Sequence, residues 1–197
     1  TNQLVPTGEL NDVGSAIRKN VGESYRAGIE LDATYAFTSK ISWNVNATFS
    51  QNKIKSFTEY YDTGADAIVN EYEDTDISFS PDIIAASRIL WTPIKNLEVN
   101  LISKFVGEQF LDNTESASKS LDSYFVNDFR VSYAIDDLLF DRIEINLLIN
   151  NIFDEMYSSN GYTYSYYDAW TTQDVVTENF YFPQAGTNLL VGLNLHF

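Results

Sequence analysis

The sequence contains no cysteine, few basic residues and no long apolar run, and each of these absences excludes a class of protein. Without cysteine there is no disulfide framework, no thiolate metal site and no cysteine nucleophile. Only 12 lysine and arginine residues stand against 28 aspartate and glutamate residues, giving a formal charge of -16. A nucleic-acid partner is therefore not expected, because binding a phosphate backbone requires a basic surface. No run approaches the roughly 18 consecutive apolar residues that a membrane-spanning helix needs.

Aromatic residues, in contrast, are abundant, and they recur with a period of two. The stretch SYRAGIELDATYAF at 24–37 places apolar side chains on odd positions and polar or small ones between them. After the short turn at 38–40 the alternation resumes at 41–50. Strict alternation over this length predicts a strand with one apolar face, so the two runs predict a hairpin.

Seven segments show this pattern, and the lengths of the connections between them alternate along the chain. The predicted strands are residues 24–37, 41–50, 82–92, 97–110, 123–135, 141–152 and about 185–197, with the tail of a possible eighth at Asn2 to Val5. Short turns alternate with long connections at 54–81, 111–122 and 153–184. In an up-and-down antiparallel sheet all the short turns fall at one end and all the long loops at the other.

Two unlike rims and strands with one apolar face are typical of outer-membrane β-barrels, which have short periplasmic turns and long extracellular loops. A soluble β-sandwich also alternates, because one face of each sheet is buried. The barrel is favoured because aromatic residues of the apolar face gather beside the short turns, where they would form a girdle at one membrane interface. The predicted girdle residues are Tyr35, Phe37, Trp43, Trp91 and Tyr133.

Four stretches resemble the C-terminal β-barrel part of the TonB-dependent outer-membrane receptors, especially those of the Bacteroidota type. NVGESYRAGIELDATYAF at 20–37 resembles a strand entry of that family, and FVGEQFLDNT at 105–114 resembles a strand-to-loop passage. NNIFDEMYSSNGY at 150–162 resembles the end of the penultimate strand, and YFPQAGTNLLVGLNLHF at 181–197 the final strand. The four stretches cover nearly the whole chain in the family's order.

The resemblance implies an all-β fold, a transmembrane antiparallel up-and-down barrel of about 22 strands closed around a plug, of which residues 1–197 would be the last seven strands. We expect this C-terminal portion to lack the plug, the earlier strands and the segment that contacts TonB. An open sheet would expose unpaired edges in lipid, which supports this expectation. The alternatives are a small passive or adhesive barrel of eight strands, and a soluble carbohydrate-binding β-sandwich.

The resemblance also implies a function and partners in the cell outer membrane. Members of the family import ferric siderophores, haem, cobalamin or glycans with energy transmitted by the TonB complex, and they are not enzymes. The expected partners are outer-membrane lipid and lipopolysaccharide, TonB, a small extracellular ligand or a surface lipoprotein, and the barrel-assembly machinery. The terminal Phe197 resembles the signal that this machinery reads. No cofactor is expected.

The long connection at 153–184 is the candidate ligand-binding segment, because aromatic faces stack on sugars or aromatic chelators while their polar edges tolerate water. Packing against neighbouring loops is the competing interpretation, and it is the more common role of loop tyrosines. The candidate ligand-binding residues are Tyr157, Tyr162, Tyr164, Tyr166, Tyr167 and Trp170.

The charged residues elsewhere in the sequence give weaker indications of a functional site. The acidic connection at 54–81 matches no defined calcium loop, so a solvated acidic face is favoured over a metal site, with a cation bridging to lipopolysaccharide as a further possibility. Charges of both signs on the even face, such as Arg26, Glu30, Arg88 and Arg142, suit a barrel lumen. The sole histidine, His196, lies at the rim opposite the long loops, and no hydrolase or phosphate-binding motif occurs, so no catalytic residue is predicted.

Overall fold

The computed structural model describes residues 3–10, 13, 15–64 and 66–197, and the chain folds almost entirely into β-strands. A short 3-10 helix, η1 (Ala117–Lys119), interrupts them. No helix among the described residues has the length and apolar character needed to cross a membrane. The strands are β1 (Gln3–Leu10), β2 (Ala16–Val21), β3 (Ser24–Thr38), β4 (Ile41–Asp62), β5 (Ala67–Asp76), β6 (Ile83–Trp91), β7 (Leu97–Val106), β8 (Gln109–Phe110), β9 (Ser120–Leu121), β10 (Tyr124–Asp136), β11 (Arg142–Asn150), β12 (Ser158–Asp168), β13 (Asp174–Pro183) and β14 (Asn188–His196).

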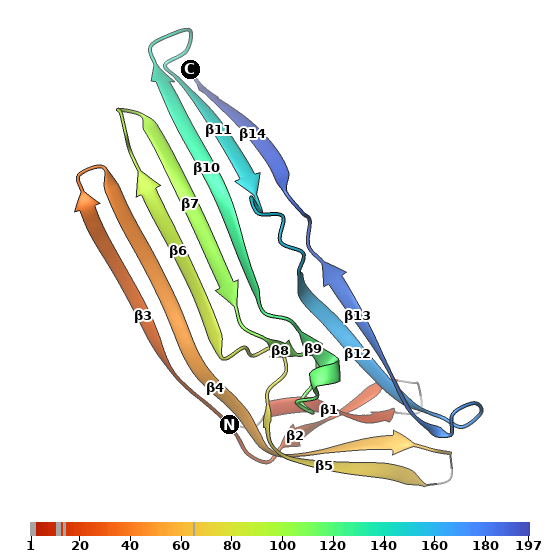
Figure 1. Ribbon diagram of the computed structural model, residues 1–197. Coiled ribbons are helices and arrows are strands. Elements are labelled where there is room, and N and C mark those ends of the chain that lie inside the picture. The colour runs from red at the N-terminus through yellow and green to blue at the C-terminus, as the bar shows by residue number, and fades with distance from the viewer. Residues whose placement is uncertain (1–2, 11–12, 14, 65) are drawn as a thin grey trace.

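The main sheet contains the seven predicted strands in the predicted up-and-down order. Its antiparallel path runs β14-β11-β10-β7-β6-β4-β3, so strands that follow one another in this path are hydrogen-bonded neighbours. The eighth strand of this sheet, β5, lies off the path and pairs with β4. The three short turns lie together at one end of the sheet, and the long connections lie at the other (Figure 1). All seven strands form one sheet, so the two packed layers of a β-sandwich are not present in the described residues.

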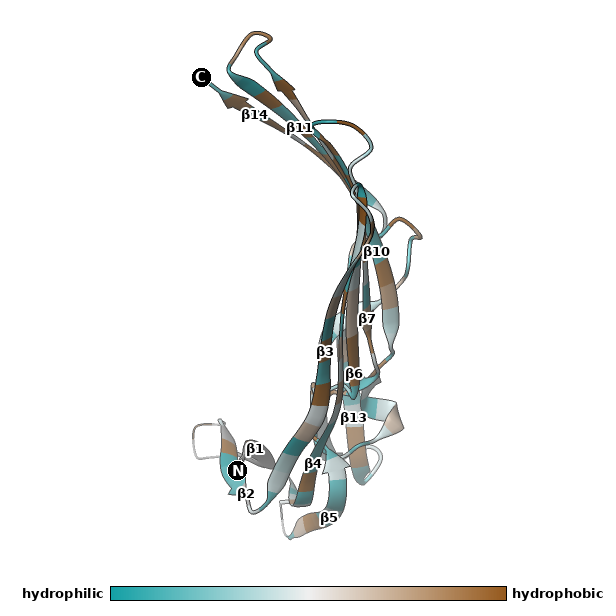
Figure 2. Ribbon diagram, turned by 90° about the vertical axis from the view of Figure 1, so that its left-hand side faces the viewer, coloured by the Kyte–Doolittle hydropathy of each residue, from teal (hydrophilic) through white to brown (hydrophobic). Residues whose placement is uncertain are grey.

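The register places most of the large apolar side chains on one face, as the alternation predicts, whereas Leu148 and Leu190 pair on the other face. Tyr35 lies opposite Trp43, and Trp43 lies opposite Ile89 on the next strand. Large apolar side chains on this face, such as Ile29 and Val191, are 65% and 68% exposed. Apolar and polar residues alternate along the strands in Figure 2. An apolar surface of this extent suits contact with lipid.

Two of the predicted long loops are instead extended hairpins. β4 continues to Asp62 and pairs with β5, and the stretch 153–184 forms the β12–β13 hairpin. The sequence predicted only the lengths of these connections and no strands within them; both stretches are rich in β-forming aromatic residues, which pair as hairpins here. The predicted strand at 97–110 also divides, since β7 ends at Val106 and β8 belongs to a separate two-stranded sheet.

The possible eighth strand is not part of the main sheet. Asn2 lies outside the described residues, whereas Gln3–Leu10 form β1 and pair with β2. The outer edges of the main sheet, β14 and β3, each have one strand neighbour among the described residues.

The buried core lies at the long-connection end of the sheet. Ile54, Phe57 and Ile77 form one cluster where β4 leaves the main sheet. A second cluster joins Val106 to Tyr124 at the start of β10. The core therefore fixes the hairpins relative to the sheet, which determines the geometry of the candidate site.

Candidate functional site

The β12–β13 hairpin presents two unlike faces. Gly161 belongs to the face that packs inward: a Cβ there would lie 2.6 Å from the carbonyl oxygen of Phe180 and 3.2 Å from Cδ2 of Leu111. The Asn179 side-chain amide donates to the carbonyl oxygen of Ser118 at 2.6 Å, which ties the same face to the residues of η1. A side chain larger than hydrogen at position 161 would push the hairpin away from its neighbours.

The opposite face of the hairpin carries the exposed aromatic rings. Tyr162 stacks on Phe180, its cross-strand partner, with ring centroids 4.7 Å apart and an interplanar angle of 13°. The rings of Tyr164 and Tyr166 stack at 5.6 Å. Stacked cross-strand pairs stabilise a hairpin and still expose one face of each ring. We name this set, Tyr162, Tyr164, Tyr166, Phe180 and Phe182, the aromatic face.

The six candidate residues do not come together in one site. Three of them belong to the aromatic face, whereas Tyr167 points to the other side of β12 and Trp170 lies in the turn at its tip, 95% exposed. Tyr157 precedes the hairpin and stacks on Tyr124, with ring centroids 4.3 Å apart. Phe180 and Phe182 are not among the six candidates, but they lie on the same face, at even positions like the tyrosines that they neighbour.

The turn at the hairpin tip is organised by Asp168. Its carboxylate accepts hydrogen bonds from the backbone N–H groups of Trp170, Thr171 and Thr172, at 2.9, 3.0 and 3.4 Å. These bonds to the charged form, that from Trp170 foremost, hold the pKa of Asp168 below its usual value.

We expect the tip to lose order in acid. Because the pKa of Asp168 is lower in the folded turn, its contribution is present above the ordinary aspartate pKa and is lost as pH falls through the lowered value. Amide exchange at Trp170 and Thr171 should therefore accelerate at low pH relative to amides in the middle of β13. Asp168→Asn, which keeps an acceptor but not the charge, should reduce this pH dependence. An unchanged pH profile in that variant would contradict the assignment.

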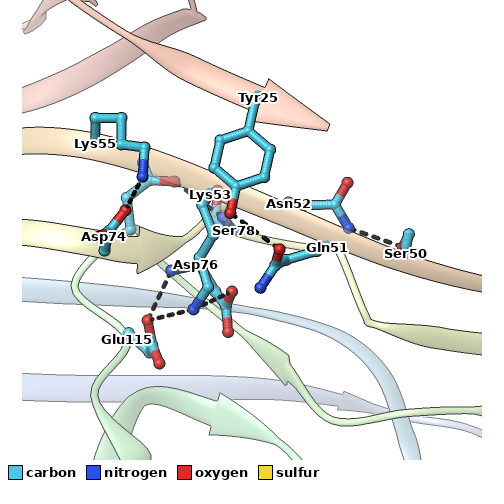
Figure 3. A network of polar contacts seen from close by, with 11 residues as sticks. Tyr25, Ser50, Gln51, Asn52, Lys53, Lys55, Asp74, Asp76, Ser78 and Glu115 are labelled. Atoms are coloured by element: carbon cyan, nitrogen blue, oxygen red, sulfur yellow. Dashed lines mark hydrogen bonds and ion pairs between the residues drawn. The ribbon is translucent and has the colours of Figure 1, made fainter. Parts of the chain in front are cut away.

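A polar network joins the β4–β5 hairpin to the connection before η1 (Figure 3). The Lys53 ammonium pairs with Asp76 at 2.7 Å and with Glu115 at 3.1 Å. Glu115 also accepts the backbone N–H of Asp76 at 2.8 Å, and Asn113 accepts that of Ser78 at 2.9 Å. The hydrogen bonds and ion pairs with the neighbouring carboxylates raise the pKa of Lys53 despite the opposing effect of burial.

A second, more buried ion pair joins the same two segments. Lys119 lies 2.8 Å from Asp112 and 4.0 Å from Glu59, and its side chain is 8% exposed. The hydroxyl of Tyr72 donates to Glu59 at 3.1 Å. Burial, reinforced by the Glu59 charge, raises the pKa of Tyr72 to about 12. Tyr72 therefore remains a neutral donor at physiological pH.

These contacts revise the expectation of a solvated acidic face at 54–81. Glu59, Asp74 and Asp76 have lysine partners, whereas Glu71 and Glu73 are exposed. The sign of the charge alone did not show which carboxylates meet a lysine from a distant connection. The described residues contain no group of three histidines, cysteines or carboxylates that could hold a metal ion.

On the even face of the sheet, several charges have polar partners in their own strand or in a neighbouring one. Arg142 pairs with Glu144 at 2.9 Å. Arg88 donates to the side-chain oxygen of Asn100 at 2.7 Å, and Arg26 to that of Asn52 at 3.2 Å. The arrangement is a mixture of ion pairs and amide contacts and provides a hydrated, polar surface opposite the lipid-suited one.

The aromatic residues at the short-turn end lie on the apolar face. Tyr35 and Phe37 pack edge to face at 4.9 Å, and both are more than half exposed. Trp43 donates its indole N–H to the hydroxyl of Ser87 at 2.8 Å. Trp91 and Tyr133 are also exposed, beside two of the short turns. At the carboxyl end, Phe197 is 88% exposed and meets Phe140 at 4.9 Å.

A continuous antiparallel sheet with one apolar face, a polar opposite face and two unlike rims defines this chain as part of the wall of an outer-membrane β-barrel. The family model described as TonB dependent receptor-like, beta-barrel matches residues 1–152, more than half of the chain. The chain belongs to this family, whose members lie in the outer membrane. A comparison with curated proteins gave no match.

Solved structures of receptors share the fold. The siderophore receptor PiuA from Acinetobacter baumannii matches with a TM-score of 0.71 and 17% identity, over 98% of this chain and 24% of that one. The ferric-catecholate import receptor Fiu from E. coli K12 matches at 0.62 and 16% identity, over 96% and 23%. The ferric yersiniabactin uptake receptor FyuA from Yersinia pestis matches at 0.57 and 18%, over 90% and 24%. The chain thus spans about a quarter of the length of these receptors.

Proposed function

We propose that this protein is an outer-membrane receptor that binds a scarce nutrient at its extracellular end and imports it with energy transmitted by TonB. Membership of the TonB-dependent receptor family supports the class of transport. The observation that carries the binding step is the aromatic face of the β12–β13 hairpin, which lies at the long-connection end with its rings stacked and exposed. In outer-membrane barrels the long connections are extracellular.

The charge of this end favours a neutral or cationic ligand over an anionic one. The stretch 154–182 contains five acidic residues and no basic one. A negative potential over an aromatic surface attracts cations and repels polyanions. A chelate of iron, cobalamin, haem or a glycan remains within the proposed class, and the ferric chelates are tested first because the solved receptors of this fold bear such names.

The remaining assignments follow from the open sheet. We propose that residues 1–197 form the C-terminal part of a larger barrel wall, because the outer edges of β3 and β14 have no strand partner among the described residues, and a bilayer does not tolerate unpaired edges. The exposed aromatics at the short-turn end, Tyr35 and Trp91 among them, would form the periplasmic girdle, and Phe197 would be read during assembly. TonB, lipopolysaccharide and a surface lipoprotein are the proposed partners.

Transport is tested with the full-length receptor in cells that have or lack TonB. We expect one ligand class among ferric citrate, a ferric catecholate, haem, cobalamin and oligosaccharides to accumulate only when both receptor and TonB are present. Replacing Tyr162 and Phe180 together by alanine should weaken ligand binding about tenfold, because the ligand would lose an aromatic stacking contact worth about 1.4 kcal/mol. Thr177→Ala, on the opposite face of the hairpin, is the matched control. Receptor-dependent accumulation that does not need TonB would point instead to a passive barrel.

A further inference from the structure

Two adjacent pockets at the long-connection end share the residues Tyr157 and Gln184. The outer pocket, of about 470 Å³, lies between the η1–β9 segment and the base of the β12–β13 hairpin. The second pocket, of about 440 Å³, lies on the even face of the sheet, where Lys104 and Asp128 line it. Tyr157 and Gln184 therefore form the wall between the outer pocket, at the loops, and the second pocket, on the lumenal face of the sheet.

Tyr157 is held in this wall by contacts on both sides. Its ring stacks on Tyr124, which is 6% exposed, and its carbonyl oxygen accepts the backbone N–H of Gln184 at 2.9 Å. The side-chain amide of Gln184 donates to the hydroxyl of Ser159 at 2.8 Å. The wall is thus built before any ligand arrives, which lowers the entropy lost on binding.

The lining of the outer pocket combines apolar surfaces with oxygen acceptors. Tyr181 is 45% exposed, and the thioether of Met156 is open to solvent. Asp122 supplies a carboxylate, and Ser120 and Ser158 supply hydroxyls. None of the described residues that line the pocket is basic. Rings and a soft thioether hold a flat group, and the carboxylate and hydroxyls accept hydrogen bonds from it.

We propose that the outer pocket binds a hydroxylated ring carrying no negative charge, with Tyr157 and Tyr181 as its walls and Asp122 selecting for a cation. A single six-membered ring is smaller than a space of about 470 Å³, so the pocket would hold one terminal ring of a larger ligand together with some water. The position beside the lumenal pocket makes it a holding site on the extracellular side of the Tyr157–Gln184 wall. The inference deepens the proposed function and rests on it for the orientation of the barrel.

The full-length receptor in detergent micelles tests this with two probes that share one ring. Dopamine carries a catechol and an ammonium, and 3,4-dihydroxyphenylacetate carries the same catechol and a carboxylate. Saturation-transfer NMR should show dopamine ring signals at least about fivefold stronger than those of the carboxylate probe. Tyr181→Ala should reduce the dopamine signal about fivefold, equivalent to about 1 kcal/mol of ring contact, while Tyr181→Phe should retain it. Asp122→Asn should remove most of the preference for dopamine.

Thr177→Ala is the control, because Thr177 lies in the same strand as Tyr181, belongs to neither the aromatic face nor the pocket lining, and pairs with Ser165. Tyr181 is half-exposed, so its replacement leaves the buried clusters intact. Equal signals from the two probes, or a dopamine signal that Thr177→Ala reduces as much as Tyr181→Ala does, would overturn the proposal. Dopamine binding to the receptor in micelles needs no TonB. A receptor that binds dopamine as described but imports nothing would therefore support the proposed pocket and refute the transport function.

Discussion

Val45→Arg should destabilise the full-length receptor by about 2–4 kcal/mol more than Asn46→Arg, although the two positions are neighbours in β4. Val45 belongs to the apolar face, opposite Ala33 on one side and Ser87 on the other. Val45 lies at the centre of the stretch of β4 that pairs with β6, Ile41 to Phe49, and a charge on the lipid side there loses its hydration, which is costly in a depth-dependent way. Asn46 belongs to the polar face and lies opposite Asp32, which would attract an arginine.

The comparison is made by denaturant unfolding of the receptor refolded into lipid vesicles, with the two variants and the wild type at the same lipid ratio. Both substitutions introduce the same side chain into the same strand, so propensity and refolding yield are matched. Equal destabilisation by both would mean that the two faces meet similar surroundings, and the reverse order would mean that the even face meets lipid. Either result would contradict the orientation assigned to the sheet.

This orientation, and the main sheet itself, could be predicted from the sequence because the side-chain period of a strand is two. Val191, Leu193 and Leu195 alternate with Gly192 and Asn194 in β14, and their register with β11 keeps them all on one face. Short turns such as that at 39–40 leave no alternative to an antiparallel neighbour. The alternation and the turn length both lie within one hairpin, so this prediction does not depend on residues that are distant in the sequence.

The two hairpins at the long-connection end, β4–β5 and β12–β13, were also encoded locally, but by weaker signals. Gly64 adopts a positive φ of 83° in the turn between β4 and β5, and its N–H donates to Asp62 at 2.7 Å. An Asp-x-Gly turn after a run of β-forming residues predicts a hairpin. In β12 the even spacing of Tyr162, Tyr164 and Tyr166 is itself a strand pattern. Both signals lie in stretches that were predicted only as long connections, without strands of their own.

The contacts between the long connections could not be predicted, because they join residues distant in the sequence. Lys119 meets Glu59 across 60 positions, and Lys53 meets Glu115 across 62. Nothing in a stretch of acidic residues distinguishes the carboxylate that will meet a buried lysine from one that will face water. The stacking of Tyr157 on Tyr124 is of the same kind, since it depends on how the hairpin returns over the sheet.

Replacing the buried lysine, Lys119→Met, should destabilise the long-connection end far more than Lys55→Met does. Lys119 is 8% exposed, and removing it leaves the carboxylates of Asp112 and Glu59 close together without a cation. Breaking a buried pair in this way costs about 3–5 kcal/mol. Lys55 pairs with Asp74 in the same hairpin, but their side chains are 45% and 65% exposed, and an exposed pair contributes about 0–1 kcal/mol.

Hydrogen exchange on the full-length receptor measures the difference, because the opening is local and the barrel strands remain folded. The amides of Leu111 and Phe79 report it, since they donate to the carbonyl oxygens of Lys119 and Phe110 at 2.8 and 3.0 Å. In Lys119→Met they should exchange at least about a hundredfold faster, as a loss of about 3 kcal/mol requires, and in Lys55→Met by less than about fivefold. Strand amides such as that of Val131 should not change in either variant. Similar acceleration in the two variants would show that the buried pair does not hold these connections together, and that the apolar cluster of Ile54, Phe57 and Ile77 fixes them alone.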